Sequence, residues 1–296
     1  MRAMQTRRNA CALIAASLAM PSGLRARETS GPVNDRLRSL EDATGGRLGA
    51  AIVETGSSRS LAYRGGERFA MCSTFKALAG GLVLSRVDRG EERLDRRIVF
   101  DASDLVTYSP VTQTHVGGDG MAVSDICEAA ITRSDNTAGN LLLASFGGPA
   151  GLTAFLRGIG DAESRLDRNE PTLNEALPGD PRDTTTPLAM AETLRTLLLG
   201  SVLSPSSRAK LRAWLIANQT GAARIRAGTP SDWRVGDKTG TGERGAASDV
   251  AILWPSPEGA PLILTVYLVG SSKPVAELNA AIADVARIMI AAAVPT

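Results

Sequence analysis

Histidine is nearly absent from this sequence of 296 residues, and its scarcity limits the chemistry open to the protein. Histidine is the residue most often used for general acid–base catalysis, and it is a frequent zinc ligand. With His115 as the only one, we expect no Ser-His-Asp triad, and a histidine-rich zinc site is excluded. We predict that His115 is a loop residue held by local hydrogen bonds, and that the protein uses neither a metal nor another cofactor.

Cysteine is also rare, with three in the chain. Cys11 falls in an N-terminal segment that we expect to be removed, which leaves Cys72 and Cys127. Two cysteines in an exported protein can form a disulfide, but their spacing does not decide the matter. We predict that both are free, with Cys72 packed beneath its neighbour Ser73 and Cys127 in the core of a helix.

Lysine is the third scarce residue. The chain has 33 basic residues but only four lysines, so the other 29 are arginines; the lysines are Lys76, Lys210, Lys238 and Lys273. Arginine stays charged, whereas the pKa of a lysine shifts readily on burial. A chain of this composition keeps lysine where a tunable amine is needed, and Lys76 and Lys238 both fall in motifs described below.

Residues 1–26 have the pattern of a secretory signal peptide. Arginines, including the pair Arg7 and Arg8, precede an uncharged stretch at 10–20, and small residues follow. Because this stretch is too short to span a membrane, we expect a periplasmic or secreted protein of residues 27–296 with no membrane attachment after cleavage. The arginine pair leaves open a twin-arginine export route beside the general one.

The charge of the mature chain gives no support to a nucleic-acid partner. Removing residues 1–26 takes away four arginines and no acid, which leaves 29 basic residues against 31 acidic ones. A nucleic-acid-binding domain is typically strongly basic. We therefore predict that the protein does not bind nucleic acid.

The periodicity of apolar residues predicts an α/β (α+β) fold with a helical lobe. Strands are expected at 48–53, 60–63, 233–238, 249–254 and 262–269, and helices at 73–89, 123–132, 136–146, 149–157, 187–199, 205–218 and 275–293. Short turns join the last three strands and imply antiparallel neighbours. We predict an antiparallel five-stranded sheet flanked by helices, from residues 27–66 and 219–296, and an all-helical lobe at about 67–218, with the active site between them.

Ser73 is a candidate nucleophile. The motif Ser-Thr-Phe-Lys at 73–76 lies where an apolar run gives way to a helical stretch, so Ser73 is expected near a helix N-terminus. The unpaired N–H groups there favour developing negative charge. Lys76, three residues on, shares its helix face, and an amine within reach of a hydroxyl can help to deprotonate it. On its own this motif is also typical of an ordinary helix start.

Two further motifs make the serine specific. Ser-Asp-Asn at 134–136 falls in a break between two helices, and Lys-Thr-Gly at 238–240 ends a strand. With Ser-x-x-Lys they form the three-motif signature of class A β-lactamases and penicillin-binding proteins. The stretches Tyr-Ser-Pro-Val-Thr at 108–112 and Arg-Leu-Asp-Arg-Asn-Glu-Pro at 165–171 extend the likeness. The mature chain resembles class A serine β-lactamases, which implies the serine β-lactamase/DD-peptidase-like fold.

The resemblance implies a role for each matching residue. Ser73 would attack the β-lactam carbonyl, with the N–H groups of Ser73 and Thr241 as the oxyanion hole. Lys76, or Glu170 through a water, would take the serine proton. Ser134 beside Lys238 would relay a proton to the ring nitrogen, and Glu170 with Asn174 would position the deacylating water. The other substrate-binding residues implied by the resemblance are Tyr108, Asn136, Thr239, Gly240 and Arg224.

Some residues near these motifs are expected to have structural roles. Asp135 would accept backbone N–H bonds in its loop, and Arg168 would form a salt bridge with Asp183 that closes the long polar loop at 165–186. Such a loop is usually functional or disordered. Ser134 could also serve as a helix N-cap ahead of Asn136, a role compatible with proton relay.

The sequence departs from the family pattern where the substrate carboxylate binds. Many family members carry a basic residue where this chain has Ala247, and Arg224 resembles the substitute arginine of several broad-spectrum members, including carbapenem-hydrolysing ones. Cys72 also resembles those members, but the partner cysteine of some of them is here Gly242, so that disulfide should be absent. The alternative for Arg224 is an arginine that is only solvated.

The resemblance predicts a monomeric enzyme that hydrolyses penicillins and cephalosporins, and carbapenems in the broader reading, and so confers antibiotic resistance. Two alternatives share the first three motifs: a penicillin-binding DD-peptidase or transpeptidase, and a non-hydrolytic penicillin sensor. Glu170 and Asn174 argue against both, because a long-lived acyl-enzyme has no use for a positioned water.

Overall fold

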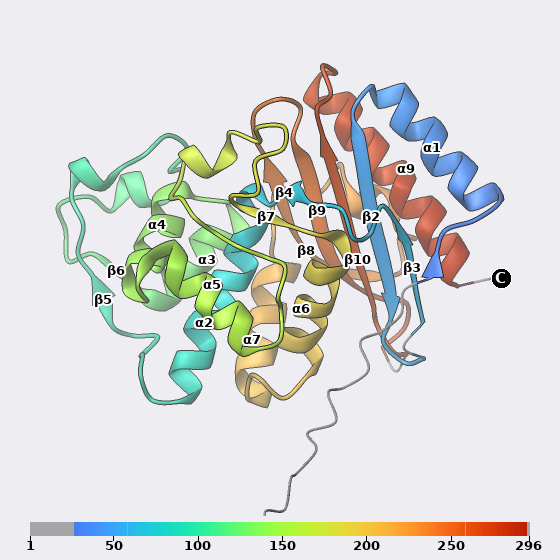
Figure 1. Cartoon of the computed structure of the whole chain (residues 1–296). Coiled ribbons are helices and arrows are strands. Elements are labelled where there is room, and N and C mark those ends of the chain that lie inside the picture. The colour runs from blue at the N-terminus through green and yellow to red at the C-terminus, as the bar shows by residue number, and fades with distance from the viewer. Residues whose placement is uncertain (1–26, 58, 258, 295–296) are drawn as a thin grey trace, which may run out of the picture.

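The computed structural model describes residues 27–57, 59–257 and 259–294, so the expected signal peptide lies outside the described residues. A central sheet has helices α1 (Pro32–Thr44) and α9 (Val275–Ala293) on one face, and a mainly helical part lies on the other side (Figure 1). Strands from both ends of the chain build the sheet, in the order β1-β3-β2-β10-β9-β8. This arrangement confirms the predicted fold class.

The five long strands of the sheet are antiparallel to their neighbours. They are β2 (Arg47–Glu54), β3 (Ser60–Tyr63), β8 (Arg234–Thr241), β9 (Ala247–Trp254) and β10 (Leu262–Val269). The predicted five-stranded sheet was short by one strand, because β1 (Arg27–Glu28) adds a two-residue parallel pairing to β3. Two residues carry no detectable periodicity, so this strand had no signal in the sequence.

Alternation along the strands divides the core into two layers. Residues such as Ala50, Leu264 and Leu268 pack with Ile282 and Val285 of α9 on one face. The opposite face packs against α6 (Pro187–Leu199) and continues into the helical part. Both faces of the sheet are therefore buried, which explains why β10 is apolar along nearly its whole length and β9 is apolar from Val250 to Trp254.

The helical part is organised around α2 (Phe75–Asp88), which is buried along most of its length. It packs against α3 (Val123–Thr132), α4 (Asn136–Ser145), α5 (Gly148–Gly158) and α7 (Pro205–Ile216). Close packing requires small residues on α2, since a Cβ at Gly80 or Gly81 would lie 2.8 Å from a side chain of a neighbouring helix. The last helix before β8 is the short α8 (Ile225–Gly228).

The loop at 165–186 contains little regular structure. A 3-10 turn, Thr172–Asn174, lies in its middle, and β7 (Thr184–Thr185) pairs with β4 (Phe69–Ala70) at its end. A second small pairing joins β5 (Arg97–Ile98) to β6 (Met121–Ala122). Among the described residues, no single helix has the length and apolar character to cross a membrane; α4 and α5, bent by 70° at their junction, meet that test only as a pair.

Candidate active site

Ser73 lies in a 3-10 turn, Cys72–Thr74, that leads directly into α2. The helix was predicted to begin at residue 73, and the α-helix begins two residues later because its entry is wound more tightly. Ser73 is buried to 7% exposure, and its Oγ accepts a hydrogen bond of 2.9 Å from Lys76 Nζ. The predicted pairing of hydroxyl and amine on one helix face is therefore present.

Lys76 is fully buried and surrounded by oxygen atoms. Its Nζ lies 2.8 Å from Glu170 Oε1 and donates to Asn136 Oδ1 at 2.7 Å and to the Ser134 carbonyl at 2.9 Å. Burial lowers the pKa of Lys76 below its ordinary value, although the Glu170 carboxylate acts in the opposite direction. The amine is thus easier to deprotonate than a surface lysine, as general-base chemistry requires.

Glu170 is held in place through both its backbone and its side chain. Asn140 on α4 accepts from the Glu170 N–H and donates to its carbonyl, at 2.9 Å in each case. Glu170 Oε2 accepts from Asn174 Nδ2 at 2.5 Å, and Oε1 accepts from Ser73 Oγ at 3.2 Å. Ser73 therefore lies within hydrogen-bond distance of both predicted proton acceptors.

An ion pair closes the loop that carries Glu170. Arg168 Nε lies 2.6 Å from Asp183 Oδ2, and Asp183 is completely buried. The other oxygen of Asp183 accepts from the backbone N–H groups of Asp167 and Arg168. The predicted salt bridge is confirmed, and Glu175 adds a second carboxylate on Arg168.

Ser134 and Asp135 have separate roles: Ser134 contacts Lys238, and Asp135 is the N-cap of α4. Ser134 has a positive φ of 57°, and its Oγ accepts from Lys238 Nζ at 2.9 Å. The N-cap of α4 is Asp135, whose carboxylate accepts from the N–H of Ala138 and also from those of Val111 and Thr112. The N-cap reading of Ser134 was wrong, and the structural role of Asp135 is confirmed.

Asn136 connects the lysine to the loop that contains Tyr108. Its Oδ1 accepts from Lys76, its Nδ2 donates to the Thr107 carbonyl at 2.8 Å, and its backbone N–H donates to the Tyr108 carbonyl. Tyr108 has φ of 67° and is 58% exposed. An aromatic ring that is held in solvent beside the site is available to contact a bound molecule.

The Lys-Thr-Gly motif lies at the end of β8, as predicted, although the strand continues to Thr241, three residues beyond its predicted end at 238. Lys238 is fully buried, and burial together with the nearby Lys76 lowers its pKa well below 10.5. Thr239 Oγ1 lies 2.6 Å from Thr220 Oγ1. A Cβ at Gly240 would lie 2.8 Å from the Met71 carbonyl, so only glycine lets β8 approach the turn that holds Ser73 this closely.

Arg224 is buried, so the solvated alternative is wrong. It precedes α8, is 4% exposed, and its guanidinium donates to the Gly240 and Ser248 carbonyls, to Thr241 Oγ1 and to Asn279 Oδ1 at 2.7 to 2.8 Å. Ala247 pairs with Thr241 across the strands and is 1% exposed. Arg224 therefore reaches the motif strand, whereas position 247 offers no charge.

The predictions for the two cysteines and for His115 are confirmed. Cys72 and Cys127 are free and buried, and burial raises the pKa of Cys72 to about 12. A Cβ at Gly242 would lie 2.7 Å from Cys72 Sγ. His115 lies after a 3-10 turn, with Nδ1 3.1 Å from the Val111 carbonyl, as a locally bonded loop residue.

Several residues that position the site were missed. Asn140 holds Glu170 and Asn279 holds Arg224. Two buried acids were also missed: Asp237 on the motif strand β8 and Asp249 on its neighbour β9. Only Asp237 had a local signal, as the neighbour of Lys238. The others contact the site across long stretches of sequence, so their partners cannot be read from spacing.

Comparisons with known proteins agree with this geometry. The model of the Beta-lactamase enzyme family matches residues 32–293. Beta-lactamase AST-1 of Nocardia asteroides is 51% identical over 262 residues, which cover 88% of this chain and 84% of that protein. Beta-lactamase CTX-M-8 of Citrobacter amalonaticus is 52% identical over 236 residues, with 79% and 80% covered.

Solved structures give the same result. A class A β-lactamase described as the last common ancestor of Gram-negative bacteria is 61% identical, with a TM-score of 0.87 and coverage of 89% of this chain and all of that one. The putative class A enzyme PenP from Rhodopseudomonas palustris is 59% identical, with a TM-score of 0.86 and the same coverage. With its buried serine, lysine and glutamate in mutual contact, this chain belongs to the class A serine β-lactamases, which hydrolyse β-lactams.

Proposed function

We propose that this β-lactamase hydrolyses penicillins, cephalosporins and carbapenems through an acyl ester on Ser73. The serine oxygen attacks the ring carbonyl, and the N–H groups of Ser73 and Thr241 stabilise the oxyanion. Two groups lie within reach of the serine proton, Lys76 at 2.9 Å and Glu170 at 3.2 Å. Either can accept it, and the lowered pKa of Lys76 favours its neutral form as an acceptor.

Ser134 completes the first half of the reaction. When the amide bond breaks, the ring nitrogen needs a proton, and the Ser134 hydroxyl can supply one; the proton that left Ser73 then restores the Ser134 hydroxyl. Lys238 donates to Ser134 Oγ at 2.9 Å, which leaves the hydroxyl proton of Ser134 free to point elsewhere. The ammonium also stabilises negative charge on that oxygen as its proton leaves.

Deacylation is the step that makes the enzyme a hydrolase, and the placement of Glu170 is the observation that carries the proposal. Its carboxylate touches Ser73 Oγ on one side and Asn174 Nδ2 on the other. A water bound by these two side chains would lie beside the ester carbon, where Glu170 can remove its proton. A peptidase that keeps its acyl ester needs no such group.

The proposal is tested by trapping the ester. Glu170→Ala should react with benzylpenicillin but fail to release it, so intact mass spectrometry should show a persistent adduct on Ser73. Ser73→Ala, which differs by one oxygen atom, should show no adduct and no turnover. Normal turnover by Glu170→Ala, or an adduct on Ser73→Ala, would contradict the assignment.

Arg224 is proposed to set the substrate range by binding the carboxylate next to the ring nitrogen, together with Thr241. Its guanidinium already donates to Thr241 Oγ1 at 2.7 Å, which supports a shared carboxylate site. A charge-assisted hydrogen bond contributes about 1.5 to 3 kcal/mol, or roughly ten- to a hundredfold in kcat/KM.

Arg224→Lys tests this assignment while keeping the buried charge. Because an ammonium cannot make the same fork of hydrogen bonds, KM should rise at least several-fold for one penicillin, one cephalosporin and one carbapenem. Steady-state kinetics on the three substrates decide it, with urea unfolding as the check on folding. An unchanged KM for all three would leave carboxylate recognition to Thr239 and Thr241.

Location and assembly complete the proposal. The pattern of residues 1–26 supports export to the periplasm, where the enzyme would meet β-lactams before they reach the cell wall. The site is built from residues of one chain, which supports a monomer as the active form.

A further inference from the structure

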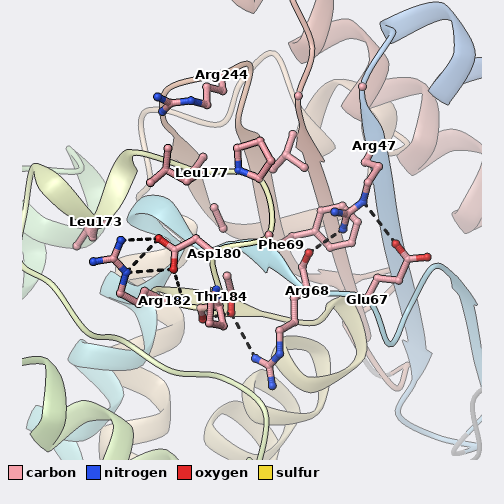
Figure 2. A pocket seen from close by; sticks show the side chains of 18 of the residues that line it. Arg47, Glu67, Arg68, Phe69, Leu173, Leu177, Asp180, Arg182, Thr184 and Arg244 are labelled. Carbon is pink, nitrogen blue, oxygen red and sulfur yellow. Dashed lines mark hydrogen bonds and ion pairs between the residues drawn. The ribbon is translucent and has the colours of Figure 1, made fainter.

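A cavity of about 570 Å³ lies between the loop at 165–186 and the ends of the two central strands of the sheet, the start of β2 and the end of β10. Leu173 and Leu177 of the loop form one side of it (Figure 2). Phe69 of β4 and Val269 at the end of β10 contribute to the other side. The residues that face Ser73 are not among its lining, so this cavity is separate from the reaction site.

The volume and the lining of the cavity fit a small organic molecule. Pockets that bind such ligands typically measure about 300 to 1,000 Å³ and combine an apolar lining with a few polar groups. Here Leu177 remains 38% exposed, one of few large apolar side chains left in solvent among the described residues. Covering it with an apolar ligand would remove that surface from water.

Positive charge dominates the polar part of the lining. Five arginines stand against two acids; the arginines are Arg47, Arg68, Arg168, Arg182 and Arg244, and the acids are Glu67 and Asp180. Three of the arginines form short ion pairs with carboxylates. These are Arg68 with Glu163, Arg168 with Asp183, and Arg182 with Asp180, at 2.6 to 2.7 Å.

The guanidinium groups of Arg47 and Arg244 each keep N–H groups without hydrogen-bond partners among the described residues. Arg47 lies over the Phe69 ring at 4.5 Å, donates once to the Arg68 carbonyl, and has its Nε 3.4 Å from Glu67. Its Nη1 has no partner among the described residues. Arg244 uses only Nη1, on Glu243 and on the Glu175 carbonyl, so its Nε and Nη2 are without partners in the same part of the chain.

The two arginines lie on opposite sides of the apolar lining. Figure 2 shows Arg244 above Leu177, with Arg47 across from it on β2 and the Phe69 ring next to the Arg47 guanidinium. A guanidinium with free N–H groups binds a carboxylate through paired hydrogen bonds. Arg47 and Arg244 are 46% and 43% exposed in their side chains, so such a ligand can reach them without unfolding the loop.

We propose that this cavity is a second ligand site, which takes an apolar, aromatic carboxylate. The carboxylate binds Arg244 or Arg47, and the aromatic body covers Leu177 and Phe69. Leu173 belongs to the same 3-10 turn as Asn174, so the ligand contacts the segment that holds Glu170 from the side away from Ser73. Binding does not depend on the proposed roles of the catalytic residues.

Isothermal titration calorimetry of the mature protein tests the proposal, with diphenylacetate as the probe and diphenylethanol as its neutral counterpart. The carboxylate should bind at least about tenfold more tightly, as expected for one charge-assisted contact. Arg47→Gln and Arg244→Gln should together remove this preference, and Leu177→Ala should weaken both compounds. Arg93→Gln, which removes an exposed arginine paired with Asp95 elsewhere, should change neither affinity.

The probe must also leave the reaction site free. The KM for a chromogenic cephalosporin should be unchanged at saturating diphenylacetate. A KM that rises in proportion to the probe concentration would mean that the probe occupies the Ser73 site, and the proposal would fail. Equal affinity for the acid and the alcohol would also overturn it, as would full binding by the double arginine variant with native circular dichroism.

Discussion

The two faces of strand β8 carry buried groups of opposite charge, and the groups differ in whether a counter-ion lies next to them. On the face toward Ser73, Lys238 donates to neutral oxygens, those of Ser134 and Thr239. On the other face, Asp237 lies beside Arg226 at 2.5 Å and accepts from Asn218 at 2.6 Å. The catalytic face thus keeps a buried charge without a counter-ion of its own, whereas the structural face pairs its charge.

Asp249 extends the second face onto β9 and is less satisfied than Asp237. Its Oδ2 accepts from the Ile225 N–H, while its buried Oδ1 has no partner. Burial and the nearby Asp237 raise the pKa of Asp249 well above 3.8. A proton on Asp249 would supply the missing donor toward Asp237, so the two carboxyls can share one negative charge. Lys238 and Asp237 are equally buried, so the two faces differ in whether the charged side chain has a partner of opposite charge.

Breaking the ion pair between Arg226 and Asp237 should cause the largest change, a loss of folding stability. Arg226→Ala leaves Asp237 buried without its cation, and removing one partner of a buried pair costs about 3 kcal/mol or more. We expect urea unfolding to show this loss while the KM of the folded enzyme changes little. Arg59→Ala, at the exposed pair with Glu54, is the matched control and should cost less than about 1 kcal/mol. Equal losses of stability in the two variants would mean that the buried ion pair contributes no more to folding than the exposed one.

On the catalytic face the effect should be functional. Lys238→Met keeps the volume but removes the ammonium, and kcat/KM should fall about a hundredfold, or about 2.7 kcal/mol. Stability should rise, because the buried lysine has a lowered pKa and the unfolded chain holds its proton more tightly.

That gain has a defined pH dependence. A lowered folded pKa costs stability at low pH, and the cost disappears as pH approaches 10.5, where the unfolded lysine also loses its proton. Unfolding of Lys238→Met and wild type at about pH 7 and about pH 10 should show the difference shrinking. Lys273→Met, an exposed control, should show neither effect. A stability loss in Lys238→Met would contradict the comparison.

The smallest effect is expected on the second face, at Asp249. The amide of Asp249→Asn keeps a donor toward Asp237 without the acid, so the change in stability should stay within about 1.5 kcal/mol. Because the folded pKa is raised, wild type loses stability as pH rises above 3.8, and the variant does not. The stability of the variant relative to wild type should therefore increase as the pH rises above about 4. A relative loss over this range would show that the carboxyl is ionised and useful.

Local patterns predicted much of this molecule. The bounds of β3, β10, α3, α6 and α9 were predicted to the residue, because each has clear periodicity or a proline or glycine at its end. The motif residues Ser73, Lys76, Ser134 and Lys238 do lie together. Motifs identified them, but nothing in their spacing gave the distances.

What the sequence could not supply depends on long-range contacts. Arg224 was taken to have a solvated alternative because an arginine near a helix is usually exposed, yet it is covered by two strands and by Asn279 of α9. Asn140 and Glu170 are 30 residues apart. Such pairs form only when the loop folds back on α4, and no local pattern records that event.

The scarcity of lysine has a practical consequence for handling the enzyme. Lys76 and Lys238 are fully buried, whereas Lys210 and Lys273 are exposed. Amine-directed reagents should therefore couple the folded protein at Lys210, at Lys273 and at the chain's α-amino group, and nowhere in the machinery around Ser73. The protein can be fixed to a sensor surface or given a dye through one of a few amines outside the reaction site, without a cysteine being engineered and without its reactive amines being blocked.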